Sequence, residues 1–164
     1  MYISLDVAKR LQWLLEVMVL GSDDLSPSWF VSAEALTGNA ALRNWQESVD
    51  IIYRLLSCNL LLVAGVASGE QIYLLGRALA EQNPFTMEPD FLSERWKPWQ
   101  LPWQGQLLYP SEHCKLLFAK HRIETYDAPL CEALIEDVEA LFEQHGVAWS
   151  DVPLVPIRGE PRDA

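Results

Sequence analysis

The sequence predicts an α+β fold that is mainly helical, with about four substantial helices and a small β-sheet in a single domain over residues 1–164. Three observations predict it. A length of 164 residues is that of one domain, and half of the residues are hydrophobic, which is enough for a core. Capping residues precede several stretches in which apolar residues recur at helical spacing. Short continuous apolar runs without that spacing predict the strands.

The N-terminal half of the sequence predicts three helices. The first covers about residues 5–20, because Ser4 can cap it and Gly21 can end it. A short second helix is expected over 27–36, where a serine precedes a proline at the first helical position. The third, over 40–57, has the clearest apolar stripe. Its steps of three and four residues predict these core side chains: Leu42, Trp45, Val49, Ile52 and Leu56.

The helix expected over 40–57 also carries charges on the side opposite its apolar stripe. Arg43 and Glu47 form one opposite-charge pair at a spacing of four residues, and Asp50 and Arg54 form another. Such pairs stabilise an exposed helix face by roughly 0.2–0.5 kcal/mol each. The sequence therefore predicts that these four side chains lie on the solvent side of the helix.

The middle of the chain predicts a buried strand over 60–64 and a helix after it. Ser68 and Gln71 have the spacing of a capping box, so this helix begins there and continues until the chain reaches a proline. Residues 84–110 then contain five prolines and three tryptophans. This composition predicts an irregular but ordered segment, with one short helix near 90–96.

The last third of the chain predicts strands followed by a long helix. Strands are expected at 106–109 and 115–119, and 122–126 is a third candidate. The long helix should begin near Asp127 and end at a glycine. The prolines that follow it predict an extended tail over 150–164.

Charge and cysteine usage restrict the classes of function. Twenty-three acidic residues against twelve Lys and Arg give a net charge of −11. This excess disfavours nucleic acid and anionic membranes as partners, because both are bound through cationic side chains. The sequence shows no secretory signal pattern, no apolar run near the ~20 residues of a membrane span, and an odd number of cysteines. We therefore expect a cytoplasmic protein.

Two stretches of the sequence invite a catalytic interpretation. Residues 62–69 lead from a strand through glycines into a helix, but they lack the Lys of a phosphate-binding loop, and Glu70 would repel phosphate. His113, Cys114 and His121 lack the spacing of a metal site or of a nucleophile with its base. We expect no catalytic residue, no metal and no cofactor, and therefore a protein that is not an enzyme.

Trp96, Trp99 and Trp103 form an aromatic cluster within the proline-rich segment. Such a cluster suits either a platform that binds a partner or a flap that packs over the helices. The flap is the commoner use of large aromatic side chains. Trp99 and Trp103 remain candidate partner-binding residues.

The strongest surface feature of the sequence is an acidic stripe on the last helix. Residues 127–143 contain six acidic residues and no basic one. Like charges at helical spacing destabilise a helix slightly, which favours a basic partner that compensates them; a merely solvated face is the alternative. Four glutamates recur at steps of four, three and four and fall within about 60° of one another at 100° per residue: Glu132, Glu136, Glu139 and Glu143.

Residues 4–65 resemble the core of a winged-helix domain, because a helix, a short helix, a long helix and a strand follow in that order. The resemblance implies that the helix over 43–56 occupies the recognition position, although its charges are balanced rather than basic. It implies a regulatory or adaptor protein that acts through protein–protein contacts.

In size, acidity and lack of a catalytic motif, the whole chain resembles small bacterial immunity proteins, and residues 130–143 carry the likeness. The resemblance implies a protein that binds a cognate basic toxin, often a nuclease, and occludes its active site. An acidic face gains fast, steered association with a cationic cleft. We expect this function, with the four stripe glutamates as contact residues and the winged-helix regulator as the alternative.

Overall fold

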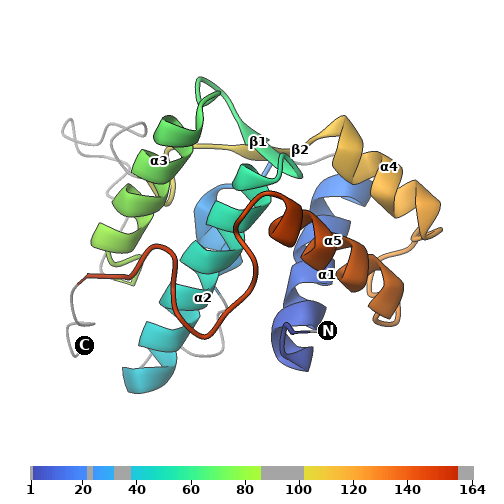
Figure 1. The fold of residues 1–164 in the computed structure, drawn as a ribbon, viewed down its shortest axis with the longest axis horizontal. Helices are drawn as coiled ribbons and strands as arrows, with labels where there is room; N and C mark the ends of the chain where they lie inside the picture. Colours follow the sequence, from blue (N-terminus) through green and yellow to red (C-terminus); the bar gives the residue numbers. More distant parts are fainter. Residues whose placement is uncertain (1, 22–23, 32–37, 86–101, 159–164) are drawn as a thin grey trace.

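The structure is a computed structural model that describes residues 2–21, 24–31, 38–85 and 102–158. It is an α+β fold that is mainly helical, as the sequence predicts (Figure 1). The described residues form five α-helices, one 3-10 helix and a two-stranded antiparallel sheet. In chain order these are α1 (Leu5–Gly21), η1 (Pro27–Phe30), α2 (Gly38–Ser57), β1 (Leu61–Val63), α3 (Gly69–Glu81), β2 (Leu108–Pro110), α4 (Glu112–Lys120) and α5 (Glu132–Gln144).

Helix α2 is the centre of the fold, and α3, β1, α5 and η1 all contact it. In Figure 1, α3 and α5 flank it on opposite sides. Between residues 40 and 57, Arg43 is the one exposed residue. The predicted apolar stripe is confirmed, with its first side chain partly buried and the other four buried: Leu42, Trp45, Val49, Ile52 and Leu56.

The prediction that the four charges of α2 face solvent is wrong for Asp50 and Arg54, and Glu47 is only partly exposed. Asp50 and Arg54 pair as expected, with Arg54 Nη1 3.1 Å from Asp50 Oδ1, but both residues are buried. Glu47 is half-buried and pairs with Arg10 of α1 at 3.3 Å rather than with Arg43. Arg43 alone is exposed.

The segment that follows α5 covers the Asp50–Arg54 pair. The Arg54 guanidinium donates to the carbonyls of Val147 at 2.9 Å and Ala148 at 3.1 Å. It also lies 4.7 Å from the centre of the Trp149 ring. Burial lowers the pKa of Arg54 and raises that of Asp50. A tertiary contact from the C-terminal end of the chain therefore places this ion pair in the interior.

The sheet is smaller than the sequence predicts. Strand β1 pairs antiparallel with β2, and Leu62 lies opposite Tyr109. Leu25 extends β2 by a bridge to Leu108, with N–O distances of 2.9 and 2.8 Å. The two strands predicted at 115–119 and 122–126 are not strands: the first lies within α4, and the second is a turn and irregular chain.

Helix α4 forms where a strand was predicted because Ser111 caps it. The Ser111 hydroxyl accepts the backbone N–H of Cys114 at 3.1 Å, which satisfies one of the free donors of the first turn. Cys114, Leu117 and Phe118 are the buried residues of α4, at the spacing of a helix face rather than of a strand. The apolar run that suggested a strand is thus one turn of an amphipathic helix.

Some of the other predicted helix boundaries agree with the structure, and others do not. The capping box of Ser68 and Gln71 is present, with the Gln71 backbone N–H 3.2 Å from the Ser68 hydroxyl. The short helix predicted over 27–36 is a 3-10 helix that ends at Phe30, and residues 32–37 lie outside the described residues. The short helix predicted near 90–96 lies outside them as well.

The C-terminal segment up to residue 158 contains bends but no helix or strand, and it is held against α2 and α3 (Figure 1); the rest of the tail predicted over 150–164 lies outside the described residues. The Gln46 amide donates to the carbonyl of Val155 at 3.1 Å and accepts the backbone N–H of Ile157 at 2.9 Å. The Arg158 backbone N–H donates to Ala80 at 2.8 Å. These contacts make the segment up to Arg158 part of the packed structure.

Candidate functional site: an acidic helix and a neighbouring pocket

Three of the four predicted stripe residues, Glu132, Glu136 and Glu143, are exposed on α5. At 100° per residue they fall within about 40° of one another. Within the described residues, none of the ion pairs includes these three carboxylates. They form an uncompensated acidic surface, which we call the α5 stripe.

Glu139 has the same helical direction as the α5 stripe but a different environment. It is 8% exposed, and one of its carboxylate oxygens accepts the backbone N–H groups of Tyr2 at 2.5 Å and Ile3 at 2.6 Å. The prediction that Glu139 faces solvent is therefore wrong, because the N-terminal residues cover this part of the helix. Tyr2 is 79% exposed, so its backbone is fixed to α5 while its aromatic ring is open to solvent.

Asp137, on another face of α5, is compensated by α4. Its carboxylate lies 2.5 Å from the Lys120 ammonium and 2.7 Å from the His121 ring. The hydrogen bonds from Lys120 and His121 lower the pKa of Asp137. Basic residues thus balance this acid, while the α5 stripe has no such partner within the part of the chain that the structure describes.

Of the two tryptophans predicted to bind a partner, Trp103 is described by the structure and Trp99 is not. Trp103 is 1% exposed, and its indole N–H donates to the carbonyls of Leu79 at 3.0 Å and Gln82 at 2.7 Å. The flap interpretation holds for this side chain, which fixes the end of α3 and lies away from any surface. Trp99 and Trp96 lie outside the described residues.

The His and Cys residues that invited a catalytic interpretation lie on or beside α4. Cys114 is buried, and burial raises its pKa to about 12. His121 binds Asp137. No group of three or more His, Cys, Asp or Glu side chains is arranged to hold a metal ion in the described ranges. At a pKa near 12 the Cys114 thiol is protonated at neutral pH and is a poor nucleophile.

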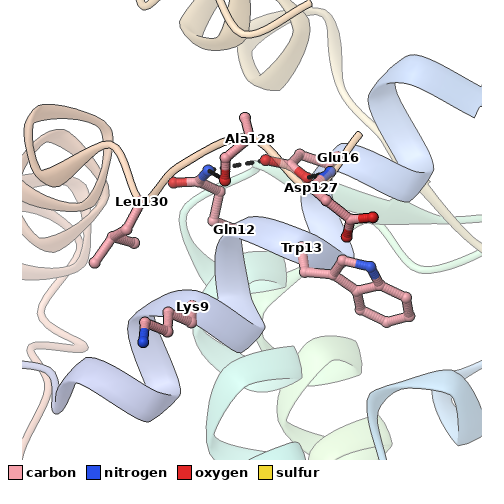
Figure 2. A pocket seen from close by; sticks show the side chains of 7 residues that line it. All are labelled: Lys9, Gln12, Trp13, Glu16, Asp127, Ala128 and Leu130. Atoms are coloured by element: carbon pink, nitrogen blue, oxygen red, sulfur yellow. Dashed lines mark hydrogen bonds between the residues drawn. The ribbon is translucent and has the colours of Figure 1, made fainter. Parts of the chain in front are cut away.

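A pocket that the sequence analysis missed lies between α1 and residues 127–130 (Figure 2). Its volume is about 260 Å³. Trp13, which is 41% exposed, lies on its α1 wall. The sequence offers one signal for this pocket: its lining residues on α1 follow Lys9 at distances of three, four and seven positions, so they lie on one face of the helix. The lining residues are Lys9, Gln12, Trp13, Glu16, Asp127, Ala128 and Leu130.

Gln12 and Glu16 hold the opposite wall of the pocket in place. Glu16 accepts the backbone N–H of Asp127 at 3.0 Å, and Gln12 accepts that of Cys131 at 2.8 Å. The Gln12 amide in turn donates to Glu16 at 2.8 Å and to the carbonyl of Pro129 at 3.2 Å. These bonds give partners to the backbone N–H groups of Asp127 and Cys131 and to the carbonyl of Pro129, none of which lies in a helix.

The late start of α5 follows from this arrangement. The sequence predicted a helix from Asp127, but α5 begins at Glu132. Asp127 has a φ of +53°, the left-handed conformation that Asp adopts more readily than most residues and that cannot begin a helix. Hydrogen bonds to Gln12 and Glu16 of α1 therefore take the place of the first helical turn that the sequence predicts from Asp127.

Comparison of the chain with protein-family models, with curated proteins and with solved structures returned no match. Among the described residues, no helix has both the length and the apolar character needed to cross a membrane.

Proposed function

We propose that this chain is an inhibitor of the immunity-protein kind, which binds a basic protein toxin and covers its cationic active site. The observation that carries the proposal is the α5 stripe of Glu132, Glu136 and Glu143, exposed and without an ion-pair partner in the described structure. Tyr2, whose backbone is bound to Glu139 of the same helix, adds an exposed aromatic ring, and such rings are frequent anchors in protein interfaces. The net charge of −11 extends the same field beyond the stripe.

The α5 stripe would act mainly on the rate and selectivity of binding. Carboxylates on one face of a rigid helix attract a cationic cleft over about 8–10 Å at physiological salt and repel acidic proteins. The Tyr2 ring would supply contact area that excludes water around the charge pairs. Inhibition would then follow from occlusion, with no turnover of any substrate.

The alternative, a winged-helix-like regulator, has less support. In that reading α2 would present a recognition surface. Between residues 40 and 57, however, Arg43 is the one exposed side chain of α2, and its central part is core. A buried helix has no free face with which to read a partner, so the α5 stripe is the better-supported binding surface.

A comparative pull-down tests the proposal. The full chain is immobilised and exposed to lysate of its source organism, in parallel with a Glu136→Lys/Glu143→Lys variant. Glu132 is left unchanged because it lies in the first turn of α5, where the helix dipole favours an acid. The matched control is Asp24→Lys/Asp151→Lys, which changes the net charge equally at two exposed positions outside the α5 stripe.

The expected result is a basic protein that wild type and control retain and that the stripe variant loses. Mass spectrometry identifies it, and its activity should be inhibited by wild type in a purified mixture. Equal retention of every basic protein by all three chains would contradict the proposal, because binding would then reflect net charge alone.

A further inference from the structure

We infer that the pocket between α1 and residues 127–130 binds a guanidinium group, that of an arginine side chain on a protein ligand. Its volume of about 260 Å³ is below the ~300–1,000 Å³ of pockets for drug-sized ligands, so it suits a single side chain. The Trp13 indole offers a flat ring, and Asp127 offers an exposed carboxylate. A planar guanidinium can stack on such a ring and bond to such a carboxylate at the same time.

The charge of Glu16 gives the pocket its preference for a cation. Glu16 is 1% exposed, and its carboxylate accepts hydrogen bonds from two uncharged donors, the Gln12 amide and the Asp127 backbone N–H. Buried carboxylates are usually paired with a cation, and within the described residues no ion pair includes Glu16. Its field, little screened by water, therefore acts on whatever enters the pocket.

Lys9 lies at the other end of the pocket. It precedes Glu16 by seven residues of α1, which is about 10 Å along the helix axis. Figure 2 shows Lys9 on one side of the view and the Glu16 and Asp127 side chains on the other, with Trp13 below Asp127. The pocket thus has a cationic and an anionic end, and a bound guanidinium belongs at the Trp13–Asp127 end. The Lys9 ammonium should weaken its binding somewhat.

The inference rests on the proposed function in one respect only, in that a basic partner would supply the arginine. The probe for testing it is therefore small: N-acetyl-arginine N-methylamide, with the corresponding citrulline compound as an uncharged control of similar shape. Binding is followed by NMR through the Trp13 indole N–H, which is assigned with a Trp13→Phe variant. For so few contacting atoms we expect a dissociation constant on the order of 1 mM.

Three variants should change the affinity for the arginine probe in different ways: one weakens it, one strengthens it and one leaves it unchanged. Asp127→Asn should weaken arginine binding about tenfold, and it keeps both the backbone donor to Glu16 and a residue type that tolerates positive φ. Lys9→Met should strengthen it about twofold by removing a like charge. Asp151→Asn, which makes the same charge change as Asp127→Asn at an exposed position outside both the pocket and the α5 stripe, should leave it unchanged.

Saturable shifts with the arginine probe and none with citrulline would support the inference. It is overturned if both probes bind equally, if Asp127→Asn and Asp151→Asn behave alike, or if about 20 mM arginine probe causes no saturable shift. The outcome is separable from the pull-down, because the probe measurement needs no toxin and the pull-down variants leave the pocket residues intact.

Discussion

The Glu139 carboxylate accepts the backbone N–H of Ile3 at 2.6 Å, across 136 positions of sequence. The same oxygen accepts the N–H of Tyr2. One glutamate of a helical series of four is thereby used to fix the N-terminus, while Glu132, Glu136 and Glu143 stay exposed. The acidic helix therefore has two roles, one in folding and one at the surface, and substitutions separate them.

Glu139→Ala should lower the free energy of unfolding by about 2 kcal/mol, because hydrogen bonds to a charged group are worth ~1.5–3 kcal/mol and the Tyr2 and Ile3 donors lose their acceptor. Glu136→Ala is the matched control on the exposed face and should change it by less than about 0.5 kcal/mol. Urea unfolding of both variants checks the difference. Equal effects would mean that Glu139 is not a structural residue.

Arg54→Met should lower the free energy of unfolding by about 3–5 kcal/mol. It leaves the buried Asp50 carboxylate without its cation and the Val147 carbonyl without its donor. The double variant Asp50→Leu/Arg54→Met should recover part of the loss, because no uncompensated charge then remains inside. A double variant no more stable than Arg54→Met alone would show that the carbonyl contacts, and not the ion pair, dominate.

The three cysteines should differ in reactivity. Burial raises the pKa of Cys58 to about 11 and that of Cys114 to about 12, so at pH 8 both remain thiols, and the thiolate is the reactive form. Cys131 is only half-buried. Iodoacetamide at pH 8 should alkylate Cys131 first, and peptide mass spectrometry identifies the site. Modification of Cys58 or Cys114 at the rate of Cys131 would contradict their burial.

The raised cysteine pKa values also set the direction of a pH effect on stability. The unfolded chain releases these thiol protons near the ordinary pKa of 9, while the folded chain holds them until about pH 11 to 12. Their contribution to stability is therefore complete below about pH 9 and is lost as the pH rises toward 12. Unfolding at pH 8 and pH 10 should show this decline, and a Cys58→Ala/Cys114→Ala variant should show less of it.

The sequence correctly predicted those features that depend only on interactions between neighbouring residues. The apolar stripe of α2 and the capping box at Ser68 depend on neighbours within one or two turns, and both are present. Helix α4 shows the limit of such signals, since an apolar run of four residues fits a strand or a helix equally well. The Ser111 cap decides between them, and a serine before an apolar run is a sequence signal for a helix.

Contacts between segments distant in the sequence account for the remaining differences between the predicted and the observed structure. Arg54 is buried because residues 147–149 cover it, Glu139 because the N-terminus does, and the start of α5 moves because Gln12 and Glu16 bind the preceding segment. Polar residues at these positions look solvated when a helix is considered alone. The pocket likewise joins two segments more than 110 positions apart, and the helical spacing of its α1 residues is too common in sequences to indicate it.

The most direct test of the central claim measures how fast the captured basic partner associates with wild type and with Glu136→Lys/Glu143→Lys. Stopped-flow mixing is performed at ionic strengths of about 0.01 and 0.15 M, where the screening length is about 30 and 8 Å. If the α5 stripe steers binding, the variant should associate more slowly at low salt, with a weaker dependence on salt, while its urea unfolding matches that of wild type. Equal association rates of the two chains at low salt would contradict the claim and leave the stripe as a solvated face.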